Sequence, residues 1–167
     1  MKQTACVLLT LIFAASAAAQ QPRPACDAPE HRQFDFWLGN FQVRTADDQL
    51  AGHNVIETTL AGCAITEHWQ GARGGEGRSI NFFDRSDGLW HQVWIDDAGQ
   101  ALYLSGGLED GSMVLAGETR GGDGTVTRQR ITWTPLEDGR VRQLWEASKD
   151  GGESWQAVFD GYYSRKD

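Results

Sequence analysis

The sequence predicts an all-β protein, an antiparallel up-and-down meander of about ten strands closed into a barrel. From Phe41 onward, short β-type runs alternate with turn signals at intervals of about ten residues, which is typical of all-β domains. The turns contain Asp-Gly and Gly-Gly pairs, which supply the positive φ angles that tight hairpins need. The 167-residue chain has 20 glycines and only 4 prolines, a balance that fits many short hairpins.

The connections are too short for parallel crossovers, which need about a dozen residues or more, so consecutive strands must run antiparallel. An open meander would leave two strand edges exposed, and closure into a barrel removes both. A two-sheet sandwich is the alternative, and we expect the barrel. The length allows one domain, which we place at residues 29–167.

Residues 1–19 have the pattern of a signal peptide, with Lys2 before a short apolar run at 7–15 and three alanines at 17–19. That run is shorter than the roughly 20 residues that a membrane span needs, and no later segment is apolar enough. We expect export to the periplasm or the medium, with residues 20–28 as a loose lead and no transmembrane segment in the mature protein. A buried N-terminal helix is the alternative.

A short helix is predicted from Pro29 to Leu38, before the first strand. Pro29 suits a first helical turn, and Gly39 can end the helix. Phe34, Trp37 and Leu38 are three and four positions apart, so they share one face of a helix. That face could close one end of the barrel.

Cys26 and Cys63 are the two cysteines left after removal of the signal peptide, which contains Cys6. Two thiols in an oxidising compartment predict one disulfide, which would tie the lead to the start of a strand. A reactive or metal-binding pair is the alternative.

Tryptophan recurs with polar residues on one face of several predicted strands, because side chains alternate faces with a period of two. An aromatic lumen that also carries amide and carboxylate groups predicts a cavity for a small, partly polar ligand, since unpaired buried polar groups are costly. A filled core with satisfied polar groups, or reversed strand faces, are the alternatives. The expected ligand-binding residues are Trp69, Trp90, Trp94 and Trp145 as stacking walls, with Glu67, Asn81, Gln92 and Gln143 as orienting hydrogen-bond groups.

Catalytic and metal chemistry have little support in the sequence. There is no Gly-x-Ser-x-Gly motif, and no two histidines have metal-ligand spacing. Glu67 is a weak candidate for a general acid or base, although a carboxylate simply hydrogen-bonded in the core is the plainer interpretation. We expect no metal and no cofactor. A net charge of −8 argues against nucleic acid as a partner.

The segment Ser148–Trp155 matches the Ser-x-Asp-x-Gly-x-x-Trp pattern called an Asp-box, which is found in sialidase propellers. A propeller has several blades of four strands, which this chain is too short to supply. We therefore expect the motif to form a hairpin and to have no catalytic role.

The stretch from His31 to Phe41, with its Phe-Asp-Phe-Trp-Leu-Gly core, resembles an uncharacterised bacterial family of small secreted proteins. The likeness continues through the segments 62–69, 77–84 and 90–94 and ends at 159–162. It implies a lipocalin-like, calycin-type barrel and no established activity. The opening is more distantly similar to that of nitrobindins, which bind haem through a histidine near the C-terminus; this chain has no histidine after His91, so no haem site is implied.

Three functional hypotheses follow. The first is an exported barrel that binds a small ligand in its lumen. The second is an enzyme that uses the same cavity, with Glu67 as acid or base. The third is an envelope interaction protein with a filled core that acts through its loops.

Overall fold

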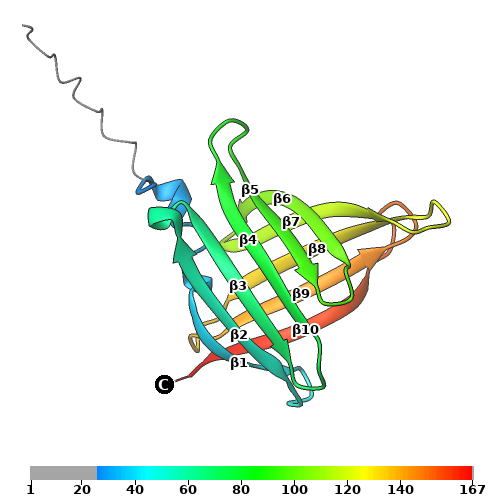
Figure 1. Cartoon of the computed structure of the whole chain (residues 1–167), viewed down its shortest axis with the longest axis horizontal. Coiled ribbons are helices and arrows are strands. Elements are labelled where there is room, and N and C mark those ends of the chain that lie inside the picture. Colours follow the sequence, from blue (N-terminus) through cyan, green and yellow to red (C-terminus); the bar gives the residue numbers. More distant parts are fainter. Residues whose placement is uncertain (1–25, 167) are drawn as a thin grey trace, which may run out of the picture.

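The computed structural model describes residues 26–166, so the predicted signal peptide and most of the lead lie outside the described residues. Ten antiparallel strands form one closed barrel in which each strand pairs with its neighbours in sequence (Figure 1). The strands are β1 (Gly39–Thr45), β2 (Leu50–Thr59), β3 (Ala64–Gly71), β4 (Glu76–Asp84), β5 (Leu89–Asp96), β6 (Ala101–Glu109), β7 (Ser112–Arg120), β8 (Val126–Pro135), β9 (Val141–Ser148) and β10 (Gln156–Arg165).

The barrel closes where the first strand meets the last. β1 pairs with β10, in a register that sets Phe41 opposite Arg165 and Val43 opposite Tyr163. This pairing leaves no free sheet edge among the ten strands. The predicted all-β meander and its closure are confirmed, and the sandwich is excluded.

The turn between β6 and β7 shows how the chain makes its hairpins. Only Asp110 and Gly111 separate the two strands, and their φ angles are 47° and 82°. Two consecutive residues with positive φ form the type I′ turn whose twist matches that of the flanking strands. Asp-Gly is among the pairs that adopt it most readily, so this turn follows directly from the sequence.

Residues 29–37 close one end of the barrel, and we call this segment the plug. Its geometry is tighter than that of an α-helix. It forms two 3₁₀ helices, η1 (Pro29–Arg32) and η2 (Asp35–Trp37), and a third, η3 (Leu60–Gly62), lies between β2 and β3 (Figure 1). Leu38, predicted to end the helix, is extended at φ −67° and ψ 135°. Phe34, which lies between η1 and η2, and Trp37 are both fully buried.

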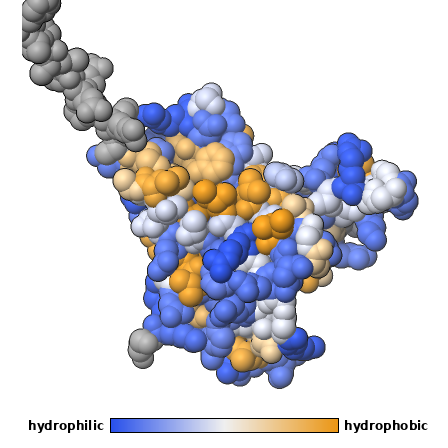
Figure 2. All heavy atoms as spheres, viewed as in Figure 1, coloured by the Kyte–Doolittle hydropathy of each residue, from blue (hydrophilic) through white to orange (hydrophobic). Residues whose placement is uncertain are grey.

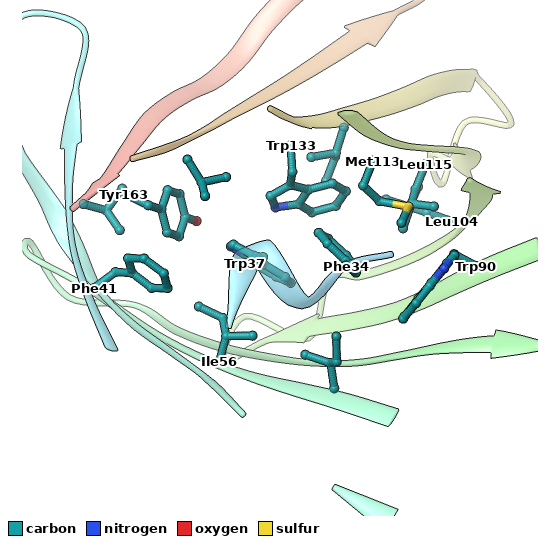
Figure 3. Packing of buried hydrophobic residues seen from close by; sticks show 14 of the residues in the cluster. Phe34, Trp37, Phe41, Ile56, Trp90, Leu104, Met113, Leu115, Trp133 and Tyr163 are labelled. Carbon is teal, nitrogen blue, oxygen red and sulfur yellow. The ribbon is translucent and has the colours of Figure 1, made fainter. Parts of the chain in front are cut away.

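Aromatic rings fill the closed end. Phe34 and Trp37 are fully buried and stack with ring centroids 4.8 Å apart. Trp133 of β8 packs against both rings, with its ring centroid 5.1 Å from that of Phe34 and 5.3 Å from that of Trp37. Figure 3 shows the two rings of the helical segment surrounded by side chains from the strands. This end of the lumen is therefore a packed core.

A disulfide joins Cys26 to Cys63 and holds the closing segment against the start of β3. Arg32 reinforces the same junction, since its Nη2 donates to the carbonyl oxygens of Cys26 at 3.2 Å and Gly62 at 2.5 Å. The predicted disulfide is thus present. None of the helices described between residues 26 and 166 is long and apolar enough to cross a membrane.

The outer surface mixes polar and apolar groups. Figure 2 shows hydrophilic side chains over most of this face, with a band of apolar ones across it. The large exposed apolar side chains include Ile80 on β4, Ile95 on β5 and Tyr103 on β6.

Candidate functional site

The lumen is built in three layers, because successive inward side chains on one strand are two residues apart. On β5, Trp90 belongs to the packed closed end, Gln92 lies in the middle, and Trp94 is half-buried toward the opposite end. On β3, Ile65 is buried at the closed end, Glu67 lies in the middle layer, and Trp69 lies in the outer layer. A polar layer thus separates the apolar core from an outer layer of aromatic rings.

A cavity of about 210 Å³ lies above the polar layer. Five of its eleven lining residues are aromatic, three are aliphatic, and three carry an amide or a carboxyl group. The lining residues are Glu67, Trp69, Gln92, Trp94, Leu102, Ile131, Gln143, Trp145, Val158, Phe159 and Tyr163. Val158 is 51 % exposed, so the cavity lies near solvent on the side away from the helical plug.

Glycines in the wall make room for this cavity. The indole of Trp94 occupies the space that a side chain at Gly77 would need, since a Cβ there would lie 2.1 Å from its Cζ2. Trp69 likewise lies against Gly52, because a Cβ on Gly52 would lie 2.8 Å from the Cη2 and Cζ2 atoms of the Trp69 ring. The glycines let these rings lie back against the barrel wall, which leaves the centre of the outer layer open.

Glu67 is the acidic group at the floor of the cavity. Its Oε1 accepts a hydrogen bond from Asn54 Nδ2 at 2.7 Å, and its Oε2 accepts one from Ser79 Oγ at 2.7 Å. Burial raises the pKa of Glu67 to about 7, because the two hydrogen bonds only partly offset the loss of water around the carboxylate. Glu67 therefore changes its charge close to neutral pH.

The hydrogen-bond network extends from Glu67 in two directions. On one side Asn81 Nδ2 donates to Ser79 Oγ at 2.9 Å, and Gln92 Nε2 donates to Asn81 Oδ1 at 2.8 Å. Every member of this arm faces inward from β3, β4 or β5. The network fixes the orientation of the Gln92 amide at the cavity wall.

On the other side the network passes through Asn54 to Tyr163. Asn54 Nδ2 lies 3.3 Å from the Tyr163 hydroxyl, which donates to Gln143 Oε1. Burial, together with the negative charge of Glu67, raises the pKa of Tyr163 well above 10. The tyrosine is thus a neutral hydrogen-bond donor over the whole physiological range.

Six of the eight residues predicted to bind ligand lie around this one cavity: Glu67, Trp69, Gln92, Trp94, Gln143 and Trp145. Trp90 lies in the closed end instead, where its Nε1 donates to the Glu30 carbonyl at 3.2 Å and to Gln33 Oε1 at 3.1 Å. Asn81 supports Gln92 from within the network without lining the cavity. Both side chains face inward, but they lie deeper than the cavity.

Sequence reasoning missed Asn54, Phe159 and Tyr163. Asn54 is fully buried beside Glu67, and Tyr163 bridges the core and the cavity. A usable signal lies in the last strand, where Phe159, Gly161 and Tyr163 are spaced by two. The partnership of Asn54 with Tyr163 joins residues 109 positions apart, and nothing in the local pattern indicates it.

His68 and His91 make hydrogen bonds to carboxylates on the outer surface. His68 Nε2 lies 2.7 Å from Glu76 Oε1, and His91 Nε2 lies 2.9 Å from Asp87 Oδ2. Asp84, Asp87 and His91 place potential metal-ligand atoms within 4.8 Å of one another. The β4–β5 turn accounts for this cluster, because each aspartate also accepts a backbone N–H of the turn.

The Asp-box forms the turn between β9 and β10. Asp150 Oδ1 accepts from Ser148 Oγ at 2.7 Å and from the Ser154 backbone N–H at 3.0 Å. The Ser154 hydroxyl donates to Asp150 Oδ2, and this hydrogen bond, together with the other two, holds the pKa of the Asp150 carboxyl well below its usual range. Trp155 packs under Arg130, whose guanidinium lies 4.2 Å from the ring centroid. These contacts stabilise the β9–β10 hairpin and lie outside the lumen.

No family model matches the chain, and no curated protein matches it either. We therefore infer function from the geometry of the cavity.

Proposed function

We propose that this protein is an exported β-barrel that binds a small, partly polar ligand in its lumen. The observation that carries the proposal is the 210 Å³ cavity with an aromatic wall and a polar floor. Sites for small molecules are typically concave and mostly apolar, with a few polar groups that fix the orientation of the ligand. The lumen has this composition.

The size of the cavity favours a compact ligand. Its volume is about 210 Å³. An apolar cavity of about 150 Å³ accommodates benzene. We therefore expect a ligand of one ring or a short branched chain, well below the size of haem or a fatty acid.

The polar floor gives such a ligand defined partners. Gln92 and Gln143 each present an amide to the cavity, and Glu67 presents its carboxyl group to the same cavity. Asn81 fixes the amide of Gln92, and Tyr163 fixes that of Gln143. Partners held by their neighbours lose little conformational freedom on binding, which favours affinity.

Export is part of the proposal and is supported by the disulfide, since such bonds persist in oxidising compartments. The signal-peptide pattern at residues 1–19 agrees with it. We also propose that the chain belongs with the secreted lipocalin-like proteins that its Phe-Asp-Phe-Trp-Leu-Gly segment resembles. The closed barrel with an N-terminal plug supports that grouping.

The second candidate is an enzyme with Glu67 as its acid or base. One observation favours it: a carboxyl group with a pKa of about 7 is poised to exchange a proton at neutral pH, and it borders a cavity. Both carboxylate oxygens already accept hydrogen bonds from Asn54 and Ser79, which suits a fixed binding group equally well. Turnover of any bound compound, lost in Glu67→Gln with binding retained, would favour the enzyme.

Native mass spectrometry of the protein purified from its own cells tests the binding proposal. We expect an extra mass that disappears on denaturation, and the same spectrum will show whether the chain begins near residue 20. A bare disulfide-bonded mass, with no change in tryptophan fluorescence across sugars, short-chain acids and amines, would instead favour an interaction protein that acts through its loops.

A further inference from the structure

We propose that the lumen selects small organic cations, specifically quaternary or tertiary ammonium compounds, with Glu67 as the counter-charge and Trp69, Trp94 and Trp145 as the enclosing walls. This inference rests on the proposed ligand-binding function and names its chemical class. Three features of the cavity carry it: its charges, the partners of Glu67, and the arrangement of its rings.

The ionisable groups that line the cavity can become negative but not positive. Among its lining residues, all of which lie in the described chain, Glu67 and Tyr163 are the ionisable groups, and no lysine, arginine or histidine is present. An anionic ligand would lack a cationic partner there and would be repelled by an ionised Glu67. The net charge of −8 on the whole chain acts in the same direction at longer range.

Glu67 is buried without a positive partner. It is 5 % exposed, and the side chains that donate to it, Asn54 and Ser79, are both neutral. A buried carboxylate is normally paired with a cation or protonated, because burial of an unpaired charge is costly. Since Glu67 lines the cavity, a cation bound there would pair with it directly.

The aromatic layer suits the rest of such a ligand. Trp69 on β3, Trp94 on β5 and Trp145 on β9 line the cavity from three separate strands, and Phe159 on β10 meets Trp69 edge-on at 5.8 Å. Trp145 donates its N–H to Gln129 Oε1 at 2.7 Å, and Gln129 does not line the cavity. Trp145 therefore offers its ring to the ligand, and aromatic rings around a cation are the known means of binding quaternary ammonium groups.

A matched set of probes tests the charge preference. Choline carries a trimethylammonium group, 3,3-dimethylbutan-1-ol is its neutral isostere, and 3,3-dimethylbutanoate is an anion of similar shape. Tryptophan fluorescence and calorimetry on the full-length disulfide-bonded protein would give their affinities. At about pH 8, where Glu67 is ionised, we expect choline to bind at least about tenfold more tightly than the alcohol, and the anion to bind more weakly still.

The pH dependence assigns that preference to Glu67. Choline has no titratable group, and Tyr163, the other titratable side chain facing Glu67 from the packed strands, stays neutral. Choline affinity should fall by up to about tenfold per pH unit below 7, as protonation of Glu67 competes with the cation. Glu67→Gln should abolish this dependence and the preference over the alcohol. Glu57→Gln, the same charge change at an exposed position of β2, should leave both unchanged.

The outcomes separate this inference from the binding proposal itself. If the alcohol binds as tightly as choline, the cavity binds ligands but does not select cations, and only this inference is overturned. If choline is preferred equally by Glu67→Gln, the selectivity arises elsewhere and the assignment is wrong. If no probe binds and the native mass is bare, both proposals fail together.

Discussion

Trp94 lies against Gly77 so closely that a Cβ on the glycine would fall 2.1 Å from the indole Cζ2. Gly77 lies on β4 and Trp94 on β5, and these two strands pair. The indole of Trp94 occupies the space that a side chain at position 77 would need. The cavity therefore depends on a residue that does not line it, since the ring would otherwise occupy the lumen. This relationship makes Gly77 a test of the site.

Substitution of Gly77 by alanine should displace Trp94 into the cavity. We expect ligand affinity to fall at least about tenfold and the free energy of unfolding to fall by about 1–3 kcal/mol, the usual cost of overpacking. Gly107→Ala is the matched control, because no atom lies within 4 Å of a Cβ there and its φ is not positive. Urea unfolding and probe titration would measure both effects; unchanged binding in Gly77→Ala would contradict the account of the cavity.

Glu67→Gln should be more stable than the wild type above neutral pH. Burial raises the pKa of Glu67 from 4.5 to about 7, so the folded state binds a proton that the unfolded state releases between those values. Wild-type stability should thus decline by about 3 kcal/mol as the pH rises through this window, and then level off. The amide in Glu67→Gln has no charge to desolvate, so this decline should be absent from the variant.

Unfolding free energies of both proteins at about pH 5 and about pH 8 check this prediction. Comparison with Glu57→Gln removes the general effect of lost negative charge. A wild type whose advantage over Glu67→Gln grows with pH would show that the carboxylate is stabilised by a partner within the free barrel.

Two tryptophans on β5 should behave differently although they share one strand face. Trp90→Ala should lower the free energy of unfolding by about 3–5 kcal/mol. Trp90 is 2 % exposed, and its ring centroid lies 5.6 Å from that of Phe34. Trp94→Ala should cost less, since Trp94 is half-buried beside an existing cavity, yet it should weaken ligand binding more. Denaturant unfolding and probe titration of both variants would check this; equal stability losses would contradict the layered lumen.

Loss of the disulfide should destabilise the plug. Cys26 and Cys63 are separated by 37 positions, and a loop of this length contributes about 3–4 kcal/mol in the chain-entropy model. The double variant Cys26→Ser with Cys63→Ser should lose about this much in denaturant unfolding. No change in the midpoint of the transition would mean that Arg32 and the aromatic packing of the plug suffice.

Local patterns in the sequence were enough to predict the strands, the turns and the inward faces. Period-two alternation places Gln92 and Trp94 inside, and residue pairs such as Asp110-Gly111 set the hairpins, since both effects act over a few residues. The closed barrel followed because a meander of short hairpins has two edges to remove. The disulfide followed from the count of cysteines outside the predicted signal peptide.

Depth along the barrel could not be predicted in this way. Trp90 and Trp94 have the same pattern, and only the plug, which covers one end, makes the first a core residue and the second a cavity wall. The helix was predicted, but not its division into two 3₁₀ helices, whose Phe34 and Trp37 rings both contact Trp133, a residue almost a hundred positions away in the sequence. The contact of Asn54 with Tyr163 depends on ring closure and has no local signature.

The most direct test of the central claim compares native mass spectra of the wild type and Gly77→Ala, both purified from the cells that make the protein. A ligand held in the lumen predicts an extra mass on the wild type that is lost on denaturation and is absent or strongly reduced on the variant. An equal extra mass on both proteins would place the bound molecule elsewhere, and a bare wild type would contradict the claim that the lumen is a ligand site.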